Sequence, residues 1–297
     1  MDAIYIIMTS TLIAISCGIL GCFLILRRMA MVADAISHAV LPGIVLAFLL
    51  SGTRDSLWMI LGAGLLGIFC TFLIEFFHKK ARLQTDAAIG VTFTWLFALG
   101  IILISVFAGQ VDLDQECVLY GEIAYVPIDL WITEGGQNFG PKALWISSMI
   151  LILNILFVRV GFKQLYVTTF DPAFAATVGI SVGLWNYLLM GAVSMTTVAS
   201  FDSVGAILVV ALMVAPPATA YLLTDKFKSM IMITIVIAFI ISIFGYYLAV
   251  ALDGSIAGAI VTVAGILFAI AFLFAPTNGI ITKRIQQRKS NAEMATS

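Results

Sequence analysis

Charged side chains are scarce in this sequence. Asp, Glu, Lys and Arg make up only 10% of its 297 residues. An ordinary soluble domain contains about 25% charged residues, so the composition excludes that class of protein. Hydrophobic residues account for 62% of the chain, and the mean hydropathy is +1.13. This composition predicts an all-α protein that crosses the membrane several times, and the net charge of −1 gives no sign of a nucleic-acid partner.

Three further features are missing. No GxxxxGK[ST] motif occurs, so the chain has no phosphate-binding loop of its own. The four cysteines form no metal-binding or redox pair, because three lie in apolar segments and Cys117 stands alone in a polar loop. The N-terminus has no basic region before its first apolar run, so we expect no cleavable signal peptide.

Long apolar runs dominate the sequence instead. A run of about 18 residues or more can cross a bilayer as a helix. Nine runs qualify, at residues 3–26, 30–50, 57–77, 87–108, 143–161, 182–200, 203–223, 229–250 and 255–275. Only a short polar stretch around Asp202 separates two of these runs, so eight spans are an alternative to nine. We expect residues 1–281 to form one membrane domain and the basic residues 282–297 to form a disordered cytoplasmic tail.

The basic residues indicate the orientation of the chain, because cytoplasmic loops carry an excess of Lys and Arg. With the N-terminus outside and nine alternating spans, thirteen of the fifteen basic residues lie inside. Only Arg54 and Lys142 then lie outside, and the opposite orientation inverts this distribution. We therefore predict an outer N-terminus and an inner C-terminus.

The long outer loop predicted at residues 109–141 is acidic. It contains Asp112, Asp114, Glu116, Glu122, Asp129 and Glu134. Such a loop can concentrate cations electrostatically, although translocated loops are often acidic without any such role. Its apolar middle, CVLYGEIAYV, is predicted to lie at the membrane interface or to re-enter the membrane, and not to form a further span.

The inner loop predicted at residues 162–181 contains a short helix. In the segment FDPAFAATVGI, Asp171 suits the N-cap of a helix and Pro172 suits its first position. Alanines such as Ala175 propagate the helix, and Gly179 can end it. A capped helix at the inner surface favours a docking element for another protein, and a plain linker is the alternative.

One polar pair lies inside an apolar run. Asp34 and His38, in the stretch DAISHAVLPG, share one face of a helix, with Cβ atoms about 6 Å apart. A helical rise of about 1.5 Å per residue from Arg28 places His38 about 15 Å along the helix, near mid-membrane. An Asp at such a depth costs about 2.5–3.5 kcal/mol by insertion scales, so ionisable residues there tend to be functional.

The pair has three interpretations. The two side chains can satisfy each other and only specify helix packing, or they can form a proton relay. They can also bind a divalent cation, which we favour. Such an ion needs further ligands from elsewhere, and a two-fold dimer would supply a second Asp and a second His. Oxygen and imidazole ligands without thiolate suit Mn²⁺, Fe²⁺ or Zn²⁺.

Prolines are expected to break two of the spans. Pro42 and Gly43 come shortly after His38, where a proline frees carbonyl groups of the preceding turn. Pro216 and Pro217 lie in the inner half of the run 203–223. Either pair can serve close packing or gating, and the sequence does not separate the two roles.

These motifs resemble those of a known family. The stretch MVADAISHAVLPGIVLAF resembles the D-A-x-S-H-x-x-L-P-G signature of the membrane permease in bacterial manganese, zinc and iron ABC importers. The segment FDPAFAATVGI is similar to the cytoplasmic coupling helix of that family, and VGAILVVALMVAPPATA to its proline-bearing late span. The resemblance extends from the first span to about residue 280.

The resemblance implies a multi-pass permease of the bacterial plasma membrane that is not itself an enzyme. Two permease chains, identical or paralogous, would pair; two ATP-binding subunits would dock below them, and an extracytoplasmic metal-binding protein would deliver the ion. Asp34 and His38 would be metal ligands, and the segment from Asp171 to Gly179 would contact the ATPase. No permanent cofactor is implied, only the transported Mn²⁺, Zn²⁺ or Fe²⁺. We favour Mn²⁺, because an oxygen-rich vestibule and one imidazole per chain suit a harder ion.

Two other classes of transporter are alternatives. An ion- or proton-driven secondary transporter would act alone, but such proteins have internal repeats and usually several buried charges. This sequence contains one acid deep in an apolar run and no convincing repeat. A siderophore- or cobalamin-type ABC permease has a similar arrangement of spans, but it would not need Asp34 and His38 as direct ligands.

Overall fold

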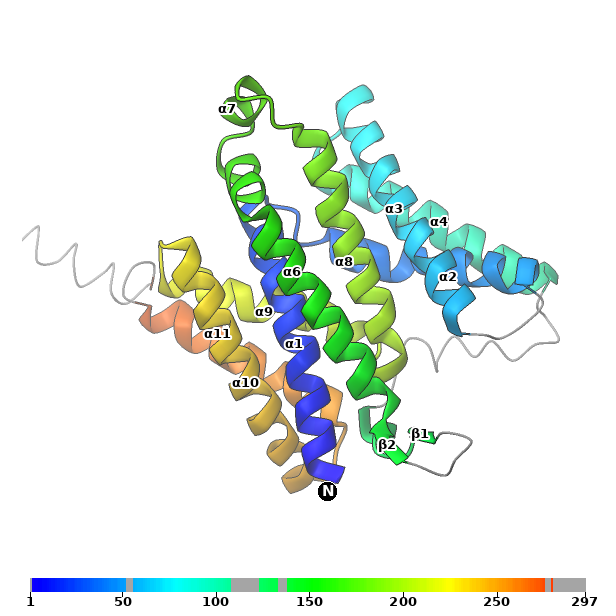
Figure 1. Cartoon of the computed structure of the whole chain (residues 1–297), viewed down its shortest axis with the longest axis vertical. Helices are drawn as coiled ribbons and strands as arrows, with labels where there is room; N and C mark the ends of the chain where they lie inside the picture. The colour runs from blue at the N-terminus through cyan, green and yellow to red at the C-terminus, as the bar shows by residue number, and fades with distance from the viewer. Residues whose placement is uncertain (1, 52–55, 108–122, 133–137, 276–278, 280–297) are drawn as a thin grey trace, which may run out of the picture.

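The computed structural model describes residues 2–51, 56–107, 123–132, 138–275 and 279 (Figure 1). Within these residues, nine helices are long and apolar enough to cross a membrane, as predicted. They are α1 (Asp2–Leu26), α2 (Val32–Ser51), α3 (Ser56–Lys80), α4 (Thr85–Phe107), α6 (Lys142–Phe170), α8 (Val182–Val204), α9 (Ala206–Leu223), α10 (Phe227–Leu252) and α11 (Ile256–Phe274). Helices suit these apolar segments because each one satisfies its own backbone hydrogen bonds without water.

The remaining described elements are short and lie at the ends of the bundle. They are α7 (Pro172–Thr177), the 3₁₀ turn η1 (Ile123–Tyr125), and the antiparallel strands β1 (Leu130–Ile132) and β2 (Asn138–Pro141). The expected all-α fold therefore carries one small hairpin in addition. In Figure 1, α7 lies at one end of the molecule, and the N-terminus and the hairpin lie at the opposite end.

Helix α1 forms the centre of the bundle. It packs against α6, α8, α9 and α10, and most of its side chains are buried. A helix that is apolar on all sides is suited to such a position. Helices α2, α3 and α4 pack on one another on one side of α1, and α9, α10 and α11 pack on one another on the other side (Figure 1).

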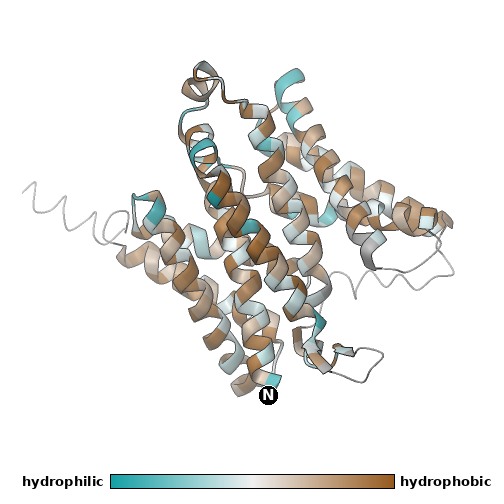
Figure 2. Cartoon of the chain, viewed as in Figure 1, coloured by the Kyte–Doolittle hydropathy of each residue, from teal (hydrophilic) through white to brown (hydrophobic). Residues whose placement is uncertain are grey.

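The outward faces of the bundle are apolar. Large side chains such as Leu65, Leu156 and Phe244 are exposed on α3, α6 and α10. Figure 2 shows apolar residues along the lengths of the helices and hydrophilic residues mainly towards their ends. This distribution fits a protein whose outer surface faces lipid.

Two helix boundaries differ from the prediction. Helix α6 continues to Phe170, so the first part of the predicted inner loop is helical. Helix α8 continues through the polar stretch around Asp202, and Gly205, with a φ of +77°, separates it from α9. The polar stretch tolerates a helix because a hydroxyl can bond to a carbonyl of its own helix, as that of Ser200 does with Thr196.

Helix α7 has the predicted caps. The side chain of Asp171 accepts a hydrogen bond from the backbone N–H of Phe174 at 2.9 Å, and Pro172 occupies the first turn. Gly179 has a φ of +81°, a conformation that favours glycine. Its N–H and that of Ile180 bond back to carbonyls of α7 in a Schellman motif. The short helix is confirmed, and its docking role stays a prediction.

The breaks predicted at the two proline sites are wrong. Helix α2 continues through Pro42 and Gly43, and α9 continues through Pro216 and Pro217. Neighbouring helices make room for the rings. A Cβ added to Gly100 of α4 would lie 2.8 Å from Cδ of Pro42. A gating role for either pair stays a prediction.

Little of the predicted outer loop lies in the described part of the chain. Asp129 is described, and its Oδ1 lies 2.8 Å from Nζ of Lys142. The other acidic residues of that loop, the segment CVLYGE and the tail 282–297 lie outside the described residues. Ile123 and Val126 are buried, and η1 packs against α1, α8 and α11.

Candidate metal site

Asp34 and His38 lie near the start of α2. Helix α1 ends in a turn at Arg28, whose φ is +58°, and α2 begins at Val32. The helix is therefore not continuous from Arg28, and the expected depth of His38 along it was too large. From Val32, the helical rise places His38 about 9 Å along α2.

The two side chains face each other. Nε2 of His38 lies 3.6 Å from Oδ1 of Asp34, and the side chains are 34% and 36% exposed, respectively. The pair is thus partly accessible in the single chain, and its depth in the membrane stays a prediction. A separation of 3.6 Å is too long for a hydrogen bond. The two groups do not satisfy each other, which weakens the interpretation that they only specify packing.

Aromatic rings from α4 support the imidazole. The ring of His38 lies 5.9 Å from that of Phe93 and 5.7 Å from that of Phe97, measured between centroids. The Phe97 ring meets it edge-on, at 78°. These contacts limit rotation of the imidazole on one side. No feature of the sequence identified the two phenylalanines, because only the packing of α4 on α2 brings them to the site.

The pair is an incomplete metal site. Among the described residues, no group of three or more His, Cys, Asp and Glu side chains could hold an ion. Pro42 has no N–H to donate to the carbonyl of His38, four residues earlier, so that carbonyl lacks its usual helical donor. Any remaining ligands must come from elsewhere.

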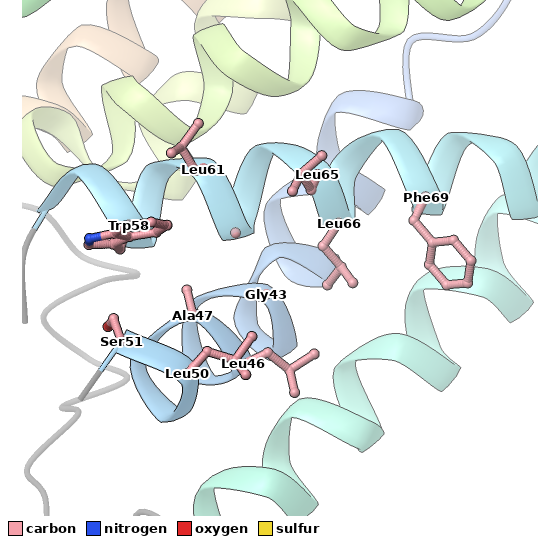
Figure 3. Close-up of a pocket in the computed structure, with 11 residues that line it drawn as sticks. Gly43, Leu46, Ala47, Leu50, Ser51, Trp58, Leu61, Leu65, Leu66 and Phe69 are labelled. Carbon is pink, nitrogen blue, oxygen red and sulfur yellow. The ribbon is translucent and has the colours of Figure 1, made fainter. Parts of the chain in front are cut away.

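A cavity of about 880 Å³ lies further along α2, between that helix and α3. Five of its eleven described lining residues are leucines, and Trp58 and Phe69 lie at its two ends (Figure 3). None of its described lining residues is His, Cys, Asp or Glu. These lining residues are therefore unsuited to binding a metal ion directly.

The coupling segment predicted from the sequence lies apart, at the end of the molecule that α7 forms (Figure 1). Ala175 is buried, while Phe174 and Val178 are 55% and 59% exposed. Helix α7 and its C-cap therefore carry exposed apolar side chains, and the docking role of the segment stays a prediction.

Comparison with known proteins identifies the family. The model of the ABC 3 transport family matches residues 3–275. The chain belongs to the ABC 3 transport family. Its relatives include the manganese transport system membrane protein MntD of Bacillus subtilis, which is 47% identical over 98% of each chain. The zinc transport system membrane protein TroD of Treponema pallidum is 42% identical, over 95% of this chain and 77% of that protein.

A solved structure agrees with this membership. PsaBC from Streptococcus pneumoniae, in complex with Fab, contains a chain with a TM-score of 0.75 and 32% identity. The match covers 95% of this chain and 94% of that one. This chain is thus a multi-pass permease of the bacterial plasma membrane. The class predicted from its sequence, a permease of a metal ABC importer, is confirmed.

Proposed function

We propose that this permease carries Mn²⁺ into the cell, with Asp34 and His38 as two of the ligands of the ion. The observation that carries the proposal is the distance of 3.6 Å between Oδ1 and Nε2. Two ligands that each lie about 2.1 Å from one ion, at the tetrahedral angle, are about 3.4 Å apart. A small shift of either side chain therefore suffices to bring both onto one ion.

The donor atoms and the relatives both bear on the choice of metal. A carboxylate and an imidazole without a thiolate suit Mn²⁺, Fe²⁺ and Zn²⁺. The relative at 47% identity is named for manganese, and the one at 42% for zinc. Iron appears in the name of a more distant relative, from Haemophilus influenzae, at 35% identity. We therefore rank Mn²⁺ first and Zn²⁺ second.

A second permease chain, identical or paralogous, completes the site in this proposal. The support is the partial exposure of Asp34 and His38 in the single chain. The lack of a third ligand within the described residues adds to it. Two-fold pairing of such chains would place two Asp–His pairs around one ion.

ATP hydrolysis belongs to separate subunits in this proposal. The chain contains no GxxxxGK[ST] motif, and α7 offers the exposed apolar side chains of Phe174 and Val178 for docking. With the N-terminus outside, α7 faces the cytoplasm, where the ATPase subunits lie. An extracytoplasmic metal-binding protein delivers the ion to the opposite face.

Uptake by the reconstituted complex tests the proposal. Asp34→Ala and His38→Ala should each abolish ATP-dependent Mn²⁺ uptake while the folded protein is retained. Asp86→Ala is a matched control, because Asp86 also lies in the first turn of a helix, α4, and should behave like the wild type. Excess Zn²⁺ should compete better than Fe²⁺. Normal uptake by Asp34→Ala, or uptake without ATPase subunits, would contradict the proposal.

A further inference from the structure

The guanidinium of Arg27, just after the end of α1, joins two other helices. Its Nε and Nη2 donate to the hydroxyls of Thr169 and Thr168, both at 3.0 Å. Its Nη1 donates to Oδ1 of Asn186, also at 3.0 Å. Three of its five N–H groups are thus directed at fixed acceptors on α6 and α8.

Arg27 has no acidic partner among the described residues, because none of the ion pairs found there includes it. Burial lowers its pKa to about 10, so it remains charged at neutral pH. Holding a partly buried cation among neutral acceptors has a desolvation cost, and apolar residues at such a position are often at least as stabilising. Stability alone therefore does not explain an arginine here.

The acceptors of Arg27 lie at the two helix ends that flank α7. Thr168 and Thr169 are in the last turn of α6, which ends one residue before Asp171, the N-cap of α7. Asn186 lies in the first turns of α8, whose N-cap is Ser181. α7 itself packs on both α6 and α8. A displacement of α7 therefore reaches the guanidinium from both sides.

The backbone of Arg27 leads directly to the metal-binding helix. Its N–H still bonds to the carbonyl of Phe23, at 3.0 Å, and the N–H of Met29 closes the turn on Leu24 at 2.9 Å. Helix α2 then begins at Val32. The connection is short and hydrogen-bonded, so the start of α2 should move together with Arg27 when Arg27 is displaced.

A second contact extends this cluster to α3. Glu75 interacts electrostatically with Tyr187 and Asn186 of α8, and it forms an ion pair with Lys79. Asn186 thus lies between the Arg27 guanidinium and the Glu75 carboxylate. Helix α3 packs along α2. The polar cluster therefore includes residues next to or on α1 and α3, the helices that precede and follow α2 in the chain.

We propose that Arg27 transmits the displacement of α7 to α2, and so acts as a positioning residue for the metal site. The inference rests on the proposed function, in which α7 contacts the ATPase and α2 binds the ion. The polar cluster of Arg27, Thr168, Thr169, Asn186 and Glu75 is the physical link between these two elements. Arg27 does not touch the ion in this scheme.

The test uses the full complex of permease and ATPase subunits in proteoliposomes. Three quantities are measured: Mn²⁺ taken up per ATP hydrolysed, Mn²⁺ affinity without nucleotide, and retention of the ATPase subunits. Arg27→Gln should lower uptake per ATP by about tenfold, with the affinity and the retention unchanged. Arg27→Lys keeps the positive charge and should retain part of the coupling. The rest should be lost, because an ammonium has no planar fork to hold both helix ends. Arg28→Gln, which removes the same charge from an exposed neighbour, should match the wild type.

Two results would overturn the inference. One is wild-type uptake per ATP in Arg27→Gln. The other is a loss of uptake that only follows a loss of nucleotide-free Mn²⁺ affinity, since that indicates a purely structural role. If Arg27→Gln does not fold, Thr168→Val and Asn186→Leu each remove one acceptor and should uncouple transport partially. Wild-type coupling in both would again overturn the inference.

The outcomes also separate this inference from the proposed function. If the wild-type complex takes up no Mn²⁺, or if Asp34→Ala takes it up normally, the proposed function fails. If the wild type transports, Asp34→Ala does not, and Arg27→Gln retains normal coupling, only the role of Arg27 fails.

Discussion

Gly43 of α2 and Gly62 of α3 face each other so closely that a Cβ added to either would lie 2.6 Å from the backbone oxygen of the other. The two backbones are in direct contact at this point, as small residues allow within membranes. Helix α2 also carries Asp34 and His38. The contact therefore fixes the helix of the two proposed metal ligands against α3.

Alanine at either glycine should separate the two helices. We expect Gly43→Ala and Gly62→Ala to lower the free energy of unfolding by about 1–3 kcal/mol, as overpacking does. Thermal unfolding in detergent measures the effect. Gly90→Ala is the control, because an added Cβ there meets nothing within 4 Å, and alanine favours a helix. A Gly62→Ala variant as stable as Gly90→Ala would contradict the close contact.

Phe97 should position the imidazole of His38. Phe97→Ala removes the ring 5.7 Å from that of His38 and leaves the imidazole free to rotate. We expect the affinity for Mn²⁺ to fall by about tenfold, as it does when groups that orient metal ligands are lost. Equilibrium binding to the purified complex measures it. Phe107→Ala, a change on the same helix at a residue 62% exposed, should leave the affinity unchanged, and equal affinities in both variants would rule out the positioning role.

Local chemistry explains why some features could be predicted from the sequence. Asp171, Pro172 and Gly179 act on the backbone of their own segment, so the caps of α7 follow from residue type and spacing. Asp34 and His38 share a face for a similar reason, because a spacing of four residues places side chains together on any helix.

Contacts between distant segments explain why other features could not be predicted. The helix survives Pro42 because Gly100, on another span, makes room for the ring. The partners of Arg27 lie 141, 142 and 159 residues further along the chain. In sequence, Arg27 is one of two basic residues in a turn that is predicted to be cytoplasmic. Only the packing of α1 against α6 and α8 shows that both helices hold it.

The N-cap of α7 should matter for ATPase docking. Asp171→Ala removes the acceptor for the N–H of Phe174 and should destabilise the short helix by about 1 kcal/mol. We expect weaker retention of the ATPase subunits on purification and a lower rate of Mn²⁺ uptake. Asp171→Asn keeps a capping oxygen and should restore both properties. If the Asn variant is as impaired as the Ala variant, the carboxylate has a role other than capping.

A buried amide joins helices α1, α6 and α8. Nδ2 of Asn154, on α6, donates to Oγ of Ser16 at 2.6 Å and to Oγ1 of Thr196 at 2.7 Å. All three side chains are buried, so the bonds tie α6 to α1 and α8 where water does not compete. Interhelical hydrogen bonds of this kind contribute about 0.6 kcal/mol on average, with a maximum near 1.7.

Asn154→Leu keeps a side chain of similar size and removes both bonds. Because it leaves the hydroxyls of Ser16 and Thr196 without this donor, we expect the free energy of unfolding to fall by about 1 kcal/mol. Thermal unfolding of the purified permease measures the change. Thr262→Ala is the control, since Thr262 is exposed and bonds only to its own helix, at Gly258. Uptake of Mn²⁺ per ATP should stay at the wild-type value in Asn154→Leu, which distinguishes a bond that holds the bundle together from the contacts of Arg27. A Leu variant more stable than the wild type would mean that apolar packing at this position outweighs the two hydrogen bonds.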